Sequence, residues 1–202
     1  MALGTLARAM NQSQFRITRT EIMAKGWSSL SRLTVEATMR DGREVELTRE
    51  VADHGPGAAI LAVDPKRGTC LLVRQWRAGA AFNGEDGFLI EVCAGLLDAD
   101  QPEECVRREA LEELGTHVHQ IRHVCDCYSS PGAVSEKLSL FVGTYSEQDC
   151  ANSGGGLLEE GEDIEVLEMP IDEAYGLIAT GAIIDAKTII LLQYVKLQNA
   201  KA

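Results

Sequence analysis

Several features that would place a protein in a special class are missing from this sequence of 202 residues. No hydrophobic run approaches the roughly 20 residues that a membrane-spanning helix needs. Positive charge is scarce, because 19 Lys and Arg stand against 31 Asp and Glu and the formal net charge is −12. A surface this acidic repels nucleic acid backbones and anionic membranes, so we expect neither as a partner.

The cysteines also lack the spacing of a metal site or a disulfide framework. There are six of them, none forms a C-x-x-C pair, and most lie among apolar residues: Cys70, Cys93, Cys105, Cys125, Cys127 and Cys150. This usage is typical of reduced cysteines in a protein core. We therefore expect a cytoplasmic protein with free thiols.

The chain is long enough for one good-sized core and a small additional subdomain. We expect a flexible N-terminal arm at 1–16, a β subdomain at 17–53 and a main domain at 54–202. Thr, Val and Ile predict three strands in the subdomain, at 17–24, 29–39 and 43–51, with a hairpin turn at Asp41-Gly42. So small a sheet buries little by itself, and we expect it to pack on a neighbour such as a second subunit.

In the main domain, strands alternate with helices. Strands are expected at 58–63, 69–77, 88–93, 118–128, 138–145 and 164–168. Residues 78–87 read as a Gly- and Ala-rich loop, and 147–163 as a long loop of a length that is more often functional than idle. Helices are expected from about Pro102, from an Asp172 cap to Gly181, and from Asp185 onward. The pattern predicts a mixed sheet covered by helices on both sides.

The helix after Pro102 carries the main chemical signal. Proline suits the first helical position, Asp100 is expected to cap the helix, and Gly115 to end it. A buried stripe is predicted at four-residue spacing: Val106, Ala110 and Leu114.

Three carboxylates, Glu109, Glu112 and Glu113, crowd one part of this helix. Their repulsion costs stability unless a cation lies among them, and hard oxygen ligands suit Mg²⁺, with Mn²⁺ as a substitute. Arg108 can hold Glu112 in place. The alternative is an ordinary solvated acidic helix.

The string from Arg108 to Gly115 resembles the second half of the Nudix box, Arg-Glu-apolar-x-Glu-Glu-x-Gly, and Gly95 resembles the start of its first half. The loop between them is one residue short, so Asp100 is placed as a cap or a supporting group and not as a metal ligand. The resemblance implies an α/β fold, the Nudix α/β/α sandwich with a mixed sheet, here with a small N-terminal antiparallel sheet.

Such a helix, a glycine at its entry strand and a distant acidic loop are typical of a metal-dependent site that cleaves a phosphoanhydride. Glu109, Glu113 and the carbonyl of Ala94 are the expected metal ligands. Glu162 is our choice for a further ligand and for the base that deprotonates water, with Glu160 second. Without the box, a solvated acidic turn would be the better interpretation of that loop.

For several other residues, the residue type alone does not decide between substrate binding and an ordinary structural role. Arg77, Arg49 and Lys187 could bind phosphate or sugar, or be plain surface charges. Trp27 and Trp76 could stack on a base or simply pack. Glu136 could reach a ligand or cap a strand.

Several stretches resemble the GDP-mannose pyrophosphatase branch of the Nudix hydrolases: 74–77, 93–98, 130–132, 154–156, 162–168 and 185–188. The resemblance covers about residue 20 to the C-terminus, and the short loop with Asp100 is part of it. It implies Mg²⁺-dependent hydrolysis of GDP-mannose to GMP and mannose 1-phosphate by a homodimer whose N-terminal sheet reaches the partner's site.

The resemblance also implies roles by position. The catalytic residues would be Glu162, Glu113, Glu112 and Arg108, and the metal ligands Ala94, Glu109, Glu113 and Glu162. Substrate contacts within one chain would be Ala94, Gly95, Leu96, Glu113, Glu136, Gly161, Glu162 and Lys187. The partner chain would add Trp27, Thr48, Arg49, Glu50 and Arg77. Trp27 replaces a smaller aromatic and Gly161 an acid, so Gly161 can offer only backbone.

Two alternatives remain. One is an ADP-ribose or other nucleoside diphosphate sugar pyrophosphatase, which would share the scaffold and differ in its pockets. The other is a non-catalytic nucleotide-binding sensor with the same fold. The presence of all three glutamates of the box argues against it.

Overall fold

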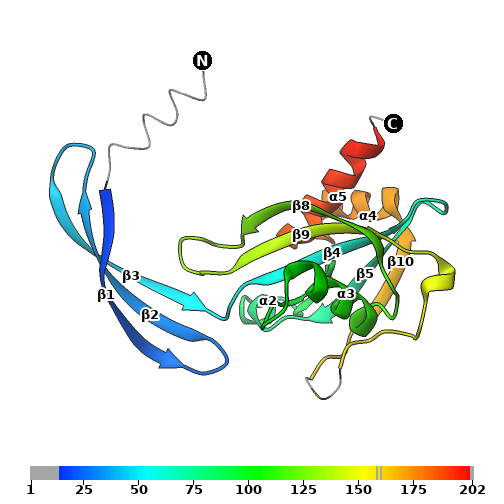
Figure 1. Ribbon diagram of the computed structural model, residues 1–202, viewed down its shortest axis with the longest axis horizontal. Coiled ribbons are helices and arrows are strands. Elements are labelled where there is room, and N and C mark those ends of the chain that lie inside the picture. Colours follow the sequence, from blue (N-terminus) through cyan, green and yellow to red (C-terminus); the bar gives the residue numbers. More distant parts are fainter. Residues whose placement is uncertain (1–13, 158, 160, 201–202) are drawn as a thin grey trace. The chain divides into compact units, whose positions relative to one another are not determined.

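A computed structural model describes residues 14–157, 159 and 161–200, and these residues form two compact units (Figure 1). The N-terminal unit consists, in its described part, of residues 14–54 and 130–136, and the larger unit of 55–129 and 137–200. Most of the expected N-terminal arm, residues 1–13, lies outside the described residues, whereas residues 14–16 belong to the first strand. The segment 130–136 joins the N-terminal unit through two backbone hydrogen bonds with Ala52. The Ala52 amide donates to the carbonyl of Ala133 (2.8 Å), and the Ala52 carbonyl accepts from the amide of Ser135 (3.0 Å).

The N-terminal unit is a three-stranded antiparallel sheet in the order β1-β2-β3. Its strands are β1 (Gln14–Lys25), β2 (Ser29–Thr38) and β3 (Glu44–Asp53), which confirms the three predicted strands. Gly42 adopts φ 84° between β2 and β3, a left-handed conformation that suits glycine, so the predicted hairpin turn is confirmed as well.

The two faces of this small sheet differ in polarity. Cross-strand partners lie on the same face, and the register pairs Phe15 with Ala37, Ile17 with Val35, and Val35 with Leu47. The other face carries charged pairs such as Arg16 with Glu36 and Arg32 with Glu50. Only Val35 and Ala37 of the apolar face are buried, while Phe15 and Ile17 are 61% and 58% exposed. The sheet therefore shows an apolar face that it does not cover by itself.

The larger unit contains a seven-stranded mixed sheet. Its main path is β10-β5-β4-β9-β8, with β6 paired to β5 and β7 to β4. The strands are β4 (Gly57–Asp64), β5 (Thr69–Trp76), β6 (Phe88–Glu91), β7 (Cys93–Leu96), β8 (His119–Tyr128), β9 (Lys137–Thr144) and β10 (Glu165–Pro170). The pair β4–β9 is parallel and the other pairs are antiparallel, so the predicted mixed sheet is confirmed.

Helices cover both faces of this sheet (Figure 1). On one face, α3 (Pro102–Glu113) packs the predicted stripe Val106, Ala110 and Leu114 against β4 and β5. On the other, α4 (Ile171–Thr180) and α5 (Ala186–Asn199) form a second core with the opposite side chains of the same strands. Because β4 is enclosed from both sides, all eight of its residues are buried. The α/β/α sandwich expected from the resemblance is confirmed.

Some local expectations were wrong. Residues 78–87 contain a short helix, α2 (Ala78–Phe82), although none of its side chains is buried. The expected strand 88–93 is two strands, because the amide of Val92 leaves the ladder and donates to the Thr188 hydroxyl on α5 (2.8 Å).

The predicted helix caps were also partly wrong. Gln101 and not Asp100 is the N-cap of α3, without a side-chain cap, because Asp100 instead faces Arg108 (3.3 Å). Pro170 precedes α4 and places Asp172 inside the first turn. Asp185 does cap α5, accepting a hydrogen bond from the Thr188 amide (2.9 Å), and Gly181 ends α4 with φ 77°.

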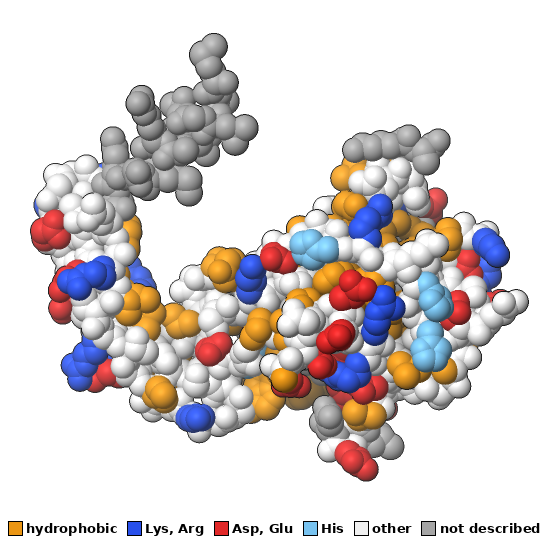
Figure 2. Space-filling view, viewed as in Figure 1, with side chains coloured by type: hydrophobic (Ala, Val, Ile, Leu, Met, Phe, Trp, Pro, Cys, Tyr) orange, Lys and Arg blue, Asp and Glu red, His pale blue; other side chains and the backbone are white. Residues whose placement is uncertain are grey.

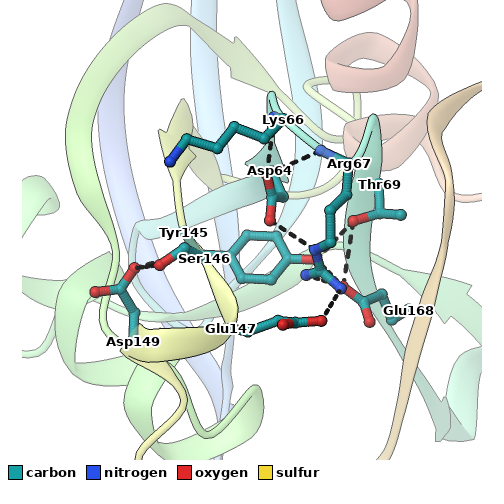
Figure 3. Close-up of polar contacts among 9 residues, drawn as sticks. All are labelled: Asp64, Lys66, Arg67, Thr69, Tyr145, Ser146, Glu147, Asp149 and Glu168. Carbon is teal, nitrogen blue, oxygen red and sulfur yellow. Dashed lines mark hydrogen bonds and ion pairs between the residues drawn. The ribbon is translucent and has the colours of Figure 1, made fainter.

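A charged cluster around Arg67 fastens three parts of the larger unit (Figure 3). Its guanidinium binds Asp64 at the end of β4 (2.7 Å), Glu147 (3.3 Å) and Glu168 on β10. Tyr145 packs beneath the guanidinium and donates to Glu168 (2.5 Å). Glu147 and Glu168 flank the long connection between β9 and β10, so this cluster holds both ends of that connection.

The middle of the connection docks on the C-terminal end of α3. The amides of Gly155 and Gly156 donate to the carbonyls of Glu113 (2.9 Å) and Glu112 (3.1 Å), which no residue inside the helix can satisfy. A Cβ on Gly154, whose φ is 63°, would lie 2.3 Å from the Glu113 carbonyl oxygen. The glycine run therefore allows the loop to lie directly on the helix that carries the glutamates.

Gly154→Ala should destabilise the protein by more than the roughly 1–2 kcal/mol that a left-handed alanine costs, because its methyl group also pushes the loop off α3. Gly181→Ala is the matched control, since Gly181 has φ 77° but open space around it. Urea denaturation measures both variants. Equal losses of unfolding free energy would contradict the docking role of Gly154.

Candidate active site

The candidate active site is built where α3 lies against β7. Glu109 and Glu113 are nearly buried, with 8% and 1% exposure, although both are acidic. Gly95 on β7 makes this possible, because a Cβ there would lie 1.8 Å from Oε1 of Glu109. The amide of Ala94 donates to Oε2 of Glu113 at 3.2 Å. Two carboxylates and the backbone of residues 94–95 thus meet in one place.

Burial raises the pKa of Glu109 to about 7, with Glu112 and Glu162 adding to the rise and Arg108 opposing it. The pKa of Glu113 is likewise raised to about 7, mainly by burial and further by Glu109 and Glu162, against hydrogen bonds from Cys93 and the Ala94 amide. Both carboxyls therefore resist ionisation, because burial disfavours their charged form more than the nearby Arg108 and hydrogen-bond donors favour it. The alternative of an ordinary solvated acidic helix does not describe these two side chains.

Arg108 organises the outer edge of the cluster. Its Nη1 lies 2.9 Å from Glu109 and 3.0 Å from Glu112, and its Nε 3.3 Å from Asp100. The predicted Arg108–Glu112 pair is present. One guanidinium shared by three carboxylates partly offsets their mutual repulsion and places Asp100 as a supporting group.

Glu162 comes from the long connection and influences both buried glutamates electrostatically. Its Oε2 accepts a hydrogen bond from the Leu157 amide (2.8 Å), and Gly156 leaves room for this carboxylate, since a Cβ there would lie 2.5 Å from it. Gly161 has φ 78° with open space around it. Glu160, the second choice for the base, lies outside the described residues.

The donor set suits a hard divalent cation. Carboxylate oxygens of Glu109 and Glu113, with backbone oxygen nearby, are the ligand type that Mg²⁺ and Mn²⁺ prefer, and a cation would relieve the unfavourable burial of these acids. Within the described residues, no three His, Cys, Asp or Glu side chains already surround a common point in metal-binding geometry. The fit therefore rests on the chemistry and crowding of the oxygens and not on a finished cage.

Two predicted substrate-binding cations meet at an acid that the sequence interpretation missed. Glu91, 3% exposed at the end of β6, binds Nε of Arg77 at 2.7 Å and Nζ of Lys187 at 2.9 Å. Lys187 also lies 2.9 Å from Asp185. The signal that could have revealed Glu91 is a single acid within the apolar stretch from Phe88 to Cys93.

The remaining predicted substrate contacts belong to the N-terminal unit. Trp27 is 80% exposed in the turn between β1 and β2 and stacks on His54, with ring centroids 5.1 Å apart. His54 in turn lies 3.8 Å from Glu136. Thr48, Arg49 and Glu50 follow one another along β3, with Glu50 paired to Arg32 (3.1 Å). His54 was also missed, and it joins Trp27 and Glu136 in one cluster.

On the visible surface of the larger unit, acidic and basic side chains lie beside one another and do not separate into a basic patch (Figure 2). No helix of the described residues is long and apolar enough to cross a membrane.

Comparison with known proteins identifies the class. The NUDIX domain pattern matches residues 53–192, which include α3, β7 and the loop with Glu162. The chain therefore belongs to the Nudix family and is a Nudix hydrolase, a family that typically depends on a divalent metal ion.

Its relatives are more specific. The chain is 43% identical over 187 residues to the GDP-mannose pyrophosphatases of Escherichia coli O1:K1 / APEC and Shigella dysenteriae serotype 1 (strain Sd197), covering 92% of this chain and 97% of theirs. It is 44% identical over 184 residues to that of Escherichia coli O139:H28 (strain E24377A / ETEC), covering 91% and 95%. The predicted resemblance is confirmed over nearly the whole chain.

In metal-free protein, stability should fall as the pH rises. The pKa of Glu109 and of Glu113, about 7 when folded, exceeds the value of 4.5 expected when unfolded, so the unfolded chain releases protons first. The loss extends from about pH 4.5 to about pH 7, and added Mg²⁺ should raise the melting temperature more at pH 8 than at pH 6. Calorimetry in EDTA and in Mg²⁺ measures this.

Glu113→Gln should flatten the pH dependence of the metal-free protein and reduce the effect of Mg²⁺. Glu104→Gln, an exposed position on the same helix, is the control and should change neither. Because Glu109 remains, a reduced pH dependence is expected, and one of unchanged size in Glu113→Gln would contradict this assignment.

Proposed function

We propose that the chain hydrolyses the diphosphate bond of GDP-mannose, releasing GMP and mannose 1-phosphate, with Mg²⁺ as cofactor. The observation that carries the proposal is the pair of buried carboxylates on the Nudix helix, with the Glu162 loop docked on the same helix. The near full-length similarity to proteins named GDP-mannose pyrophosphatases supports the choice of substrate.

In this proposal, Glu109, Glu113, Glu162 and the carbonyl of Ala94 hold the metal. Bound Mg²⁺ would neutralise the diphosphate and make the attacking water more acidic. Glu162 accepts the proton of that water, and the water oxygen adds to one phosphorus while the bridging oxygen leaves with the other. Arg108 keeps Glu109 and Glu112 oriented.

Substrate binding in this proposal uses the backbone of residues 94–96 and Gly161, with Lys187 and Glu136 of the same chain. A second copy contributes Trp27, Thr48, Arg49, Glu50 and Arg77. The uncovered apolar face of the N-terminal sheet supports a homodimer, because a second sheet would remove Phe15 and Ile17 from water. The six free cysteines support a cytoplasmic location.

A substrate panel with Mg²⁺ tests the activity: GDP-mannose, ADP-ribose, ADP-glucose, UDP-glucose and diadenosine polyphosphates, with nucleoside monophosphate release followed by chromatography. GDP-mannose should give the largest kcat/KM, and EDTA should abolish turnover. A preference for ADP-ribose would contradict the assignment of GDP-mannose as the substrate but would leave the proposed mechanism unchanged. Binding without turnover of any compound would favour a nucleotide sensor.

Glu162→Gln should lower kcat by about 10²- to 10⁴-fold, the usual contribution of a positioned general base. Glu159→Gln is the matched control, because Glu159 is an exposed acid in the same loop. Equal effects of the two substitutions on kcat would show that the loop contributes charge and not a specific base.

The dimer proposal predicts that Ile17→Lys yields monomers in multi-angle light scattering, because it places a charge on the apolar face of β1. Gln14→Lys puts the same side chain at the polar face of the same strand and should leave the dimer intact. A monomeric parent protein, or a dimer that tolerates Ile17→Lys, would contradict the proposed interface.

A further inference from the structure

One buried acid in the larger unit binds two cations at once. Oε2 of Glu91 accepts a hydrogen bond from Nε of Arg77 (2.7 Å), and Oε1 accepts one from Nζ of Lys187 (2.9 Å). The Glu91 side chain is 4% exposed, Lys187 11% and Arg77 40%. The two cations come from distant parts of the chain, the loop after β5 and the first turn of α5, and Glu91 brings them together.

The donors that remain free point to a role beyond holding the fold together. Among the described residues, the guanidinium of Arg77 is bound only at Nε, so both terminal nitrogens stay available. Lys187 has three N–H donors, and Glu91 and Asp185 use two of them. Each cation thus keeps donors suited to an anionic group.

The Arg67 cluster is the contrast within the same unit. Its guanidinium is engaged at Nε, Nη1 and Nη2 by three carboxylates and lies over Tyr145 (Figure 3). The donors of Arg67 are used in contacts within the protein, so we interpret Arg67 as structural. Arg77 makes the same 2.7 Å Nε contact with a buried acid but leaves its outer edge open.

A nearly buried Lys187 needs a negative partner to stay charged. Burial lowers the pKa of Lys187, but Glu91 and Asp185 raise it by more, so the pKa is raised above its ordinary value. Asp185 is already committed to α5, since its other oxygen accepts from the amide and the hydroxyl of Thr188 (2.9 and 2.6 Å). Glu91 is therefore the partner that can orient Lys187 toward Arg77.

We propose that Glu91 is a positioning residue, which orders Lys187 and Arg77 so that their free donors bind the anionic part of the substrate. This inference rests on the proposed function, which assigns substrate contacts to the two cations. In that assignment Lys187 serves the site of its own chain and Arg77 the site of a second copy, and the Glu91 carboxylate orients both.

The test compares Glu91→Gln with Asp64→Asn, a matched change of a buried acid bound to an arginine Nε at the same distance. Glu91→Gln should raise KM for GDP-mannose between about tenfold and a hundredfold, as misplaced binding groups do, with kcat little changed. Asp64→Asn should lower the melting temperature and leave KM unchanged. An unchanged KM in Glu91→Gln, with a lowered melting temperature, would make Glu91 structural and overturn the proposal.

A double-mutant cycle separates positioning from direct contact. In an Arg77→Met/Lys187→Met background, Glu91→Gln should have no further effect on KM, because the groups that it positions are gone. A further rise in KM of the same size would overturn a role through these cations.

Binding keeps this test independent of turnover. Calorimetric titration of GDP-mannose with Mg²⁺ in the Glu162→Gln background should show the same weakening when Glu91→Gln is added. If the parent protein binds GDP-mannose without hydrolysing it, the proposed function fails and the titration still decides the role of Glu91. If it does not bind GDP-mannose, both proposals are wrong.

Discussion

The burial of two carboxylates, Glu109 and Glu113, on one helix is the constraint on which the rest of the active-site region depends. Acids held out of water repel each other and resist ionisation, which costs stability unless cations and donors compensate. Gly95 leaves the space, the Ala94 amide donates, and Arg108 supplies positive charge. The stability lost in creating this oxygen-rich site is offset by the close packing of α3 on β4 and β5.

The surrounding elements bring further groups to that helix without adding a rigid cage. Glycine amides satisfy the last carbonyls of α3, so the loop that carries Glu162 is fastened by its backbone. The Glu162 carboxylate is itself oriented by the Leu157 amide, which donates to Oε2. Arg67 and its acids fasten the ends of the same loop. Within the part of the chain that the structure describes, Arg67 is bound at all three guanidinium nitrogens, whereas Arg77 is bound only at Nε and Lys187 through two of its three donors.

Much of the fold and the heart of the site could be predicted from the sequence. The helix with Val106, Ala110 and Leu114, the three N-terminal strands and the Asp185 cap follow from local periodicity and capping chemistry, which neighbours in the chain determine. The predictions that failed depend on partners far away in sequence. Asp100 pairs with Arg108 instead of capping α3. Val92 leaves the strand because its amide donates to the hydroxyl of Thr188 on α5 and not to a neighbouring strand.

By itself, the sequence determined the Nudix box, the order of strands and helices, and the acidic residues available for metal binding, because these are properties of spacing and composition. Only the tertiary structure decided that Glu109 and Glu113 are buried, that the glycine run rests on their helix, and that Glu91 joins Arg77 to Lys187. Burial and long-range pairing arise when distant segments exclude water together, and no local pattern records which segments those are.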